Sequence, residues 1–317
     1  MNSFGQVRVG VIKSALVLVS SIGVGMGQAA SAEDLTVASF NVESGGADAV
    51  VIATQQIGPL DGVDIWGLSE VQNQAWVEVL ETGAEAGEAA GFDSILGTTG
   101  GGDRLAVLYN SSLLEAIRYE ELDEINFGGN VRAALVVQFR LRQTGEEFLF
   151  MVNHLYRTET EQRHEQAQLL NAWVQEQSLP VVAVGDYNFD FDVVDGDQGD
   201  RDEGFDLFTQ NEAFVWIRPN NLVATFCSTQ YNSILDFVFV ANAAKNWAVK
   251  SSEVLFADPA SNYCPDDDTT SDHRPIAATF QLPQSGQSTG ETTSAQPMSL
   301  LQQVLQAIVS LVKSLQS

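Results

Sequence analysis

The sequence predicts an α/β fold, because short strand-like runs alternate with helical stretches along most of its length. Residues 35–42 and 63–68 are apolar, partly β-branched runs that are typical of strands. Residues 158–177 show the clearest helical spacing, with Leu169, Leu170 and Trp173 on one face. With 44% hydrophobic and 9% aromatic residues, the chain can bury a sizeable core and is not compositionally disordered.

The predicted elements follow one another in a regular order. Strands are expected over 35–42, 63–68, 104–109, 131–141, 148–155, 180–184, 234–240 and 274–282. Helices are expected over 48–57, 74–90 and 158–177. Gly58-Pro59 ends the first helix and Gly91 ends the second. Together these elements define one domain over residues 33–283.

The first 32 residues are expected to form a signal peptide. Arg8 and Lys13 precede an apolar stretch over 14–26, and Ala30-Ser31-Ala32 matches a cleavage site before Glu33. A transmembrane anchor is the weaker alternative, because the stretch is short and interrupted by Ser and Gly. We therefore expect a secreted or periplasmic protein with no transmembrane segment after signal removal.

The composition changes again near the C-terminus. Residues 284–297 are rich in Ser, Thr, Gln and Gly, which predicts a flexible linker. Residues 298–317 predict an amphipathic helix with a short apolar seam of Leu301, Leu305, Ile308, Val312 and Leu315. This helix could dock on the domain, self-associate or contact a membrane surface, and the pattern leaves these alternatives open.

Charge and cysteine content limit the possible partners. The formal net charge is −27, and it becomes −29 once Arg8 and Lys13 leave with the signal peptide. Such a field repels polyanions, which disfavours tight nucleic-acid binding but permits turnover at a metal-neutralised site. Cys227 and Cys264 could form a disulfide in an exported protein or remain two buried thiols. Two cysteines without clustered histidines do not make a usual zinc site.

Polar residues recur at the ends of the predicted strands, where an open α/β sheet presents its site. They are Asn41, Glu70, His154, Asp186, Asn188, Asp236, Asp272 and His273. Each has a structural explanation on its own: a turn cap, a solvated charge or a core histidine. Asp236 is harder to explain, because it interrupts the apolar run 234–240 and is costly to bury without a partner such as His273.

The order of these residues resembles the endonuclease/exonuclease/phosphatase superfamily, in a secreted bacterial form. The matching segments are TVASFNVES, DIWGLSEVQN, DRLAVLYN, FMVNHLYR, VVAVGDYNFD, ILDFVFV and SDHRPIAATF. GDYN and SDHRPI are the most specific of them. The resemblance implies a DNase-I-like, four-layer α/β sandwich, in which two facing mixed β-sheets are flanked by helices.

The resemblance also implies a role for each site residue. Glu70 is similar to the principal metal ligand, and Asn41 and Asp272 complete the predicted metal-binding set. The predicted catalytic residues are His154, Asp186, Asn188, Asp236 and His273. Among them Asp186 is similar to the residue that orients or deprotonates water, and Asp236 to the residue that orients His273. Oxygen ligands suit a hard cation, so Mg²⁺ (or Mn²⁺) is the expected cofactor.

Direct attack of water on a phosphoester follows from this residue set, since no cysteine, serine or lysine nucleophile is required. We expect a phosphodiesterase or nuclease acting on nucleic acid. The alternatives are a phosphomonoesterase and a sphingomyelinase-like enzyme acting on a small or lipid phosphoester, which the acidic charge favours. Few cations are available to grip a nucleic-acid backbone: the candidates are Arg104, Arg132, Arg157, Arg201 and Arg274.

A run of acids follows the Asp186 motif, from Asp190 to Asp206. We expect a solvated acidic loop; an accessory Ca²⁺ site is the alternative, although the spacing does not fit a calcium-binding loop of the EF-hand type. The acids at 266–268 are similarly ambiguous, and His164 is expected at the surface. A catalytically silent binding module and a calcium-dependent extracellular binding protein are the competing functions of another class.

Overall fold

The computed structural model describes residues 34–127, 131–228, 230–257 and 269–283. All of them belong to one compact unit, residues 32–317. The predicted signal peptide, linker and C-terminal helix lie outside the described residues, as do Cys264 and the acids at 266–268. Among the helices that the structure describes, none is long and apolar enough to cross a membrane.

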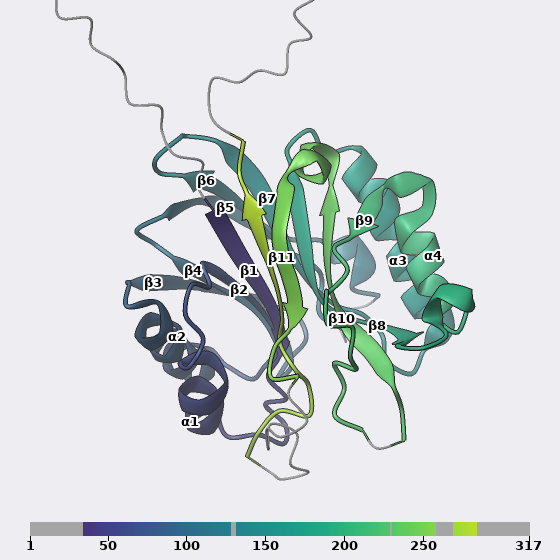
Figure 1. Ribbon diagram of the computed structural model, residues 1–317, viewed down its shortest axis with the longest axis horizontal. Helices are drawn as coiled ribbons and strands as arrows, with labels where there is room; N and C mark the ends of the chain where they lie inside the picture. The colour runs from purple at the N-terminus through teal and green to yellow at the C-terminus, as the bar shows by residue number, and fades with distance from the viewer. Residues whose placement is uncertain (1–33, 128–130, 229, 258–268, 284–317) are drawn as a thin grey trace, which may run out of the picture. The chain divides into compact units, whose positions relative to one another are not determined.

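In the part of the chain that the structure describes, twelve strands form two mixed sheets of six strands each (Figure 1). The first sheet has the order β11-β12-β1-β2-β4-β3, with β1 (Asp34–Asn41), β2 (Ile65–Val71), β3 (Phe92–Leu96), β4 (Arg104–Asn110), β11 (Ala248–Val254) and β12 (Ile276–Gln281). The second has the order β5-β6-β7-β8-β10-β9, with β5 (Leu114–Glu121), β6 (Leu135–Leu141), β7 (Glu147–His154), β8 (Val181–Asp192), β9 (Phe214–Trp216) and β10 (Ser233–Ala241). One parallel pair lies in each sheet, β1 with β2 and β7 with β8.

Helices cover the outer face of each sheet (Figure 1). On the first sheet lie α1 (Ala49–Val51), the π-helical turn η1 (Ile52–Ile57) and α2 (Gln74–Glu88). On the second lie α3 (Thr160–Gln175) and α4 (Glu203–Thr209). Short 3₁₀ turns complete the chain: η2 (Asp123–Ile125), η3 (Gly196–Gln198), η4 (Gln210–Glu212) and η5 (Asn242–Asn246). This four-layer α/β sandwich confirms the predicted fold.

Alternation of side chains along the strands fills the layers. In β8, Val182 and Val184 belong to the core between the sheets, whereas Val181 and Ala183 belong to the core beneath α3 and α4. A third core of residues from β1, β2 and α2 lies between the first sheet and its helices. A strand buried on both faces reads as a continuous apolar run, which explains the pattern of residues 180–184.

One glycine lies at a point of close contact between the sheets. A Cβ atom on Gly67 of β2 would lie 2.3 Å from Cγ2 of Val184 and 3.0 Å from Cγ2 of Val152. Both valines belong to strands of the opposite sheet. Because real Cβ contacts are not this short, the observed packing of β2 on β7 and β8 requires glycine at position 67.

Most acids of the run are exposed, as predicted for a solvated segment, but its backbone is not a single loop. Strand β8 extends to Asp192, and residues 203–209 form α4, whose N-cap is Asp202. The Asp202 side chain is 8% exposed and is paired with Arg163, while His164, predicted at the surface, is 18% exposed and lies 3.2 Å from the same carboxylate. These contacts tie α3 to the start of α4.

Other acids of the run also form hydrogen bonds or ion pairs within the protein. Asp192 accepts hydrogen bonds from the backbone of Val194 and Asp195, and Asp197 pairs with Arg218 at 2.7 Å. Asp206 pairs with Arg201 at 2.8 Å. These carboxylates therefore have partners within the protein, and an accessory Ca²⁺ site stays a prediction.

Candidate functional site

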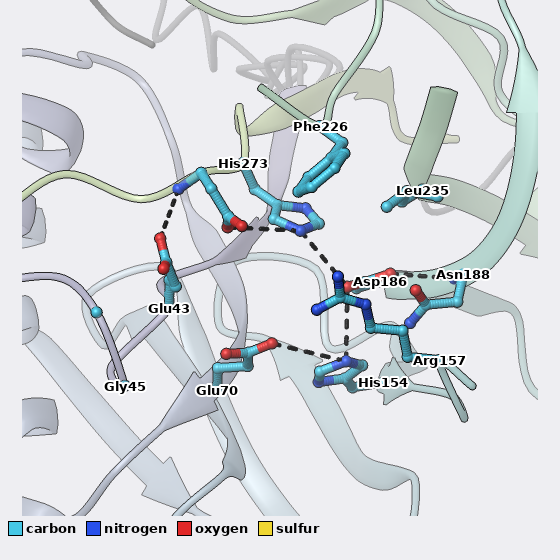
Figure 2. Close-up of a pocket in the computed structure, with 12 residues that line it drawn as sticks. Glu43, Gly45, Glu70, His154, Arg157, Asp186, Asn188, Phe226, Leu235 and His273 are labelled. Carbon is cyan, nitrogen blue, oxygen red and sulfur yellow. Dashed lines mark hydrogen bonds and ion pairs between the residues drawn. The ribbon is translucent and has the colours of Figure 1, made fainter. Parts of the chain in front are cut away.

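The ends of strands from both sheets converge on one pocket of about 280 Å³ (Figure 2). Six of the eight predicted site residues line it: Glu70, His154, Asp186, Asn188, Asp272 and His273. Asn41 and Asp236 lie directly behind these, hydrogen-bonded to lining residues. The remaining lining residues are Glu43, Gly45, Gly46, Arg157, Phe226 and Leu235.

Asp186 lies at the centre of the site because of strand register. It is aligned with His154 across the parallel pair of β7 and β8, and with Asp236 across the antiparallel pair of β8 and β10. Its Oδ2 atom lies 3.5 Å from Nε2 of His154 and 3.8 Å from Nε2 of His273. The preceding Gly185 has a φ of 145°, and a Cβ there would lie 2.0 Å from the carbonyl oxygen of Asn153, so glycine is required.

Asn41 joins the two sheets at this point. Its Nδ2 atom donates to Oε1 of Glu70 at 2.9 Å and to Oδ2 of Asp186 at 3.1 Å. Its Oδ1 atom accepts from the backbone N–H of Glu43 at 3.0 Å. The amide oxygen that we expected to face a metal ion therefore contacts the protein, and a half-turn of the amide would bring it toward the carboxylates.

The carboxylates and imidazole beside Asn41 form a group that fits a divalent cation. One potential ligand atom each from Glu70, His154 and Asp186 lies within 4.8 Å of the others. Two carboxylates whose oxygens lie within this distance favour a cation between them, since their charges otherwise repel. Glu70 holds a left-handed backbone conformation, with φ 59°, at the end of β2.

Asp272 lies on another side of the pocket. Its backbone N–H donates to Oε2 of Glu43 at 2.7 Å, and its Oδ1 atom lies 3.8 Å from Nε2 of His273. The carboxylate is 42% exposed and belongs to neither of the potential metal-binding groups among the described residues. A ligand role for Asp272 stays a prediction.

His273 and Asp236 form a buried pair. Nδ1 of His273 lies 2.7 Å from Oδ2 of Asp236. Burial lowers the pKa of His273, but the charge and hydrogen bond of Asp236, with the charges of Asp186 and Asp272, outweigh it and raise that pKa to about 10. Burial also raises the pKa of Asp236, which the imidazole opposes. Because the pair shares a short hydrogen bond, we take it as an imidazolium–carboxylate pair at neutral pH, with Nε2–H directed toward Asp186.

His154 has two partners that sequence patterns did not reveal. Its Nδ1 atom contacts a guanidinium nitrogen of Arg132 and lies 3.7 Å from Oδ1 of Asp103. A guanidinium can only donate, so Nδ1 is the acceptor in this contact, and Nε2 is the ring nitrogen that faces Asp186. Burial acts to raise the pKa of Asp103, but His154 and Arg132 lower it below its ordinary value. Asp103 begins the DRLAVLYN segment, a position that its sequence alone does not mark as part of a site.

Glu43 is a further acid that the sequence analysis missed. Burial, opposed by a hydrogen bond from the Asp272 backbone and reinforced by the carboxylates of Asp272 and Glu70, raises its pKa to about 7. It follows Asn41 by two residues and adopts a left-handed backbone with φ 46°, which turns the chain toward Asp272. The available signal was the proximity of Glu43 to Asn41 in the segment FNVES.

The opposite wall combines an amide with apolar side chains. Asn188 adopts φ 53°, its backbone N–H donates to Oδ1 of Asp186 at 3.0 Å, and its Nδ2 donates to the Leu155 carbonyl at 3.2 Å. Phe226 packs against the His273 imidazole with ring centres 5.5 Å apart, and Leu235 lies beside it (Figure 2). This wall excludes water from one side of the imidazole.

Comparison with known proteins identifies relatives of this architecture. The sequence model of the Endonuclease/Exonuclease/phosphatase family matches residues 38–273. An endonuclease/exonuclease/phosphatase family protein from Bacteroides thetaiotaomicron superposes with a TM-score of 0.60 at 21% identity, covering 78% of this chain and 98% of that one. A mannosyl-6-phosphatase from the same organism gives 0.57 at 20% identity, covering 78% and 100%.

D. rerio TDP2, in complex with a single strand DNA product, gives a TM-score of 0.59 at 15% identity, covering 78% of this chain and 99% of that one. At these identities the structural likenesses establish the fold alone. A comparison with curated proteins found no significant match.

Proposed function

Because this chain belongs to the Endonuclease/Exonuclease/phosphatase family, whose members are metal-dependent phosphoester hydrolases, we propose that it is an exported phosphodiesterase that works by direct attack of water. The observation that carries the proposal is the convergence of Glu70, His154, Asp186 and His273 on one pocket. Carboxylates for a cation and imidazole donors for phosphate oxygens are the two requirements of this chemistry. Both are met within a few ångströms of Asp186.

Each side chain then has a distinct task. Glu70, Asp186 and, after a half-turn of its amide, Asn41 would hold a divalent cation, which would supply positive charge to the phosphoryl oxygens. Asp186 orients the attacking water and accepts its proton. His154 and His273 donate from Nε2 to phosphoryl oxygens, and Asn188 fixes the Asp186 carboxylate through its backbone N–H. The oxygen-rich set favours Mg²⁺, and Mn²⁺ is the expected substitute.

The arginines favour a short substrate over a long nucleic acid. Four of the five candidates for backbone contacts are occupied: Arg104 by the Gly101 carbonyl, Arg132 by Asp103, Arg201 by Asp206 and Arg274 by the Ala224 carbonyl. A chain of formal charge −27 repels polyanions as well. We therefore propose small phosphodiesters, including short oligonucleotides. Small phosphomonoesters are the second candidate, because the acidic surface repels a small ester less than it repels a long polyanion.

The test uses the chain from residue 33 onward, assayed against bis(p-nitrophenyl) phosphate, p-nitrophenyl phosphate, plasmid DNA, RNA and sphingomyelin. Each substrate is offered with Mg²⁺, Mn²⁺, Ca²⁺ or EDTA. We expect metal-dependent hydrolysis that falls by about a hundredfold or more in Asp186→Ala and in His273→Ala. Asp61→Ala, an exposed acid in a loop, is the control. Full activity in either site variant, or turnover that EDTA does not affect, would contradict the proposal. N-terminal sequencing of protein recovered outside the cell tests export and cleavage before Glu33.

A further inference from the structure

Arg157 is the arginine among the described residues that line the pocket. The acids of the lining are Glu43, Glu70, Asp186 and Asp272. A phosphate entering such a site meets strong repulsion unless cations oppose it, and His273 and a bound metal ion offset only part of that charge. Arg157 therefore adds the permanent positive charge that this wall of acids lacks.

The loop that carries Arg157 is held in place from several directions. The backbone N–H of Leu155 donates to the Asp186 carbonyl at 3.0 Å, and the backbone N–H of Tyr156 donates to Oε1 of the buried Gln166 at 2.9 Å. The Arg163 guanidinium donates to the carbonyls of Tyr156 and Arg157 at 2.9 and 2.8 Å. The loop is thus hydrogen-bonded both to β8 and to α3.

Arg163 itself is buried and anchored. It is 6% exposed, and its other terminal nitrogen pairs with Asp202 at 2.5 Å. The interior side chains of Gln166, Arg163 and Asp202 therefore hold the backbone of the loop that carries Arg157. A surface arginine without a binding role does not need a fixed backbone. A substrate-binding side chain benefits from one, because less conformational entropy is lost on binding.

The Arg157 side chain has no hydrogen-bond or ion-pair partner among the residues that the structure describes. The other arginines of that part of the chain that were candidates for substrate contacts all have one. Arg157 lines the pocket together with His154, Asp186 and His273, and Figure 2 shows its side chain extending toward these residues. All its donors thus remain available for a ligand.

We propose that Arg157 binds the non-bridging oxygens of the phosphoryl group under attack. This inference rests on the proposed function and adds a substrate-binding residue to the site. A guanidinium presents two parallel N–H groups that match two phosphate oxygens. Because the attraction grows with the charge of the ester, the site depends on Arg157 more for phosphomonoester dianions than for phosphodiester monoanions.

The experiment compares Arg157→Gln and Arg157→Lys with the parent protein and with Arg118→Gln. Arg118 is an exposed arginine on β5 outside the pocket, so its variant matches the change in net charge. We expect Arg157→Gln to lower kcat/KM for bis(p-nitrophenyl) phosphate by about 10- to 100-fold, and for p-nitrophenyl phosphate by several-fold more. Arg157→Lys keeps the charge but loses the paired donors, so its kcat/KM should lie between those of the parent and of Arg157→Gln. Arg118→Gln should match the parent.

Binding of inorganic phosphate, measured by calorimetry with Mg²⁺ present, separates this inference from the proposed function. The dissociation constant should rise by about tenfold or more in Arg157→Gln, even if none of the test esters is a substrate. Thermal melting shows whether the variants fold. Unchanged phosphate binding in a folded Arg157→Gln protein, or an equal loss for the two ester classes, would overturn the inference.

Discussion

The amide of Asn41, the last residue of β1, donates a hydrogen bond of 3.1 Å to the carboxylate of Asp186 on β8. The two strands belong to different sheets. The reaction site therefore straddles the interface between the sheets, and the same amide also donates to Glu70 at 2.9 Å. One neutral side chain thus separates two carboxylates.

Asn41→Asp should make the site dependent on a cation for stability. The substitution replaces two donated hydrogen bonds with a third negative charge, at a cost of about 1–3 kcal/mol. In EDTA we expect the Tm to fall by about 3–10 °C, since 1 kcal/mol corresponds to roughly 2–4 °C in a domain of this size. Mg²⁺ should then raise the Tm of the variant more than that of the parent. Equal Tm values in EDTA would show that the amide is not needed to separate Glu70 and Asp186.

Asp236→Asn should move the alkaline limit of activity. His273 has a pKa of about 10 because of Asp236, against an ordinary value of 6.5, so the parent keeps the protonated imidazole through neutral pH and loses it as pH rises through about 10. In the variant, burial dominates and lowers the pKa of His273. We expect kcat/KM at pH 8 to drop by about a hundredfold or more, with the limit shifted to lower pH. A pH profile that keeps the parent's alkaline limb contradicts this role.

Removal of the metal ion should destabilise the parent protein. The carboxylates of Glu70 and Asp186 belong to a group of potential ligands within 4.8 Å of one another, so a cation that binds only the folded state shifts the unfolding equilibrium toward that state. At a hundredfold excess over Kd the gain is about 2.7 kcal/mol, or about 5–10 °C in Tm. Differential scanning fluorimetry with Mg²⁺, Mn²⁺ and EDTA measures it. Glu70→Gln should lose most of the rise, and a rise that persists in this variant would place the cation elsewhere.

Asp202→Asn should unfold the domain more readily, because it leaves the guanidinium of Arg163 buried without its counter-charge. We expect a loss of about 3 kcal/mol. The matched control is Asp206→Asn, whose carboxylate is 57% exposed and pairs with Arg201, and which should change stability by less than about 1 kcal/mol. Urea unfolding of both variants distinguishes them.

Acid should affect the same pair in the parent protein. Burial acts to raise the pKa of Asp202, but Arg163 and a hydrogen bond from Gly204 lower it below its ordinary value of 3.8. A depressed folded-state pKa contributes stability above the unfolded value, and this contribution is lost as pH falls through the folded-state value. The stability difference between the parent and Asp202→Asn should therefore shrink below about pH 4. A difference that stays constant to pH 2 would contradict the ion pair.

The sequence predicted most of the central strands, because they are apolar on both faces. It missed β5, whose exposed residues Arg118, Tyr119 and Glu120 do not form an apolar run, and β3, β9 and β11, which lie at or beside sheet edges. It also missed α4, which lies within the acidic run and is stabilised by Asp202 acting across to α3. Local composition does not reveal contacts made between distant segments.

The candidate site followed the same rule. Residues in recognisable segments, such as Asp186 and His273, were predicted from the sequence, and the structure places them in one pocket. Glu43 and Asp103 were missed, and Arg132 was predicted only as a possible contact to a nucleic-acid backbone. The relation of these residues to the site depends on turns and on packing between strands that are far apart in the sequence. The expected orientation of the Asn41 amide also depended on a backbone contact, with Glu43, that only the folded chain provides.

The absence of a side chain at position 67 has an effect beyond packing. Glycine there lets β2 approach Val184 on β8, and these two strands carry Glu70 and Asp186 a few residues further on. A methyl group at 67 would act as a wedge in the apolar interior and lengthen the span that a bound ion must bridge. A substitution at position 67 can thus change or abolish the activity, although it alters no charged group and lies where no substrate reaches.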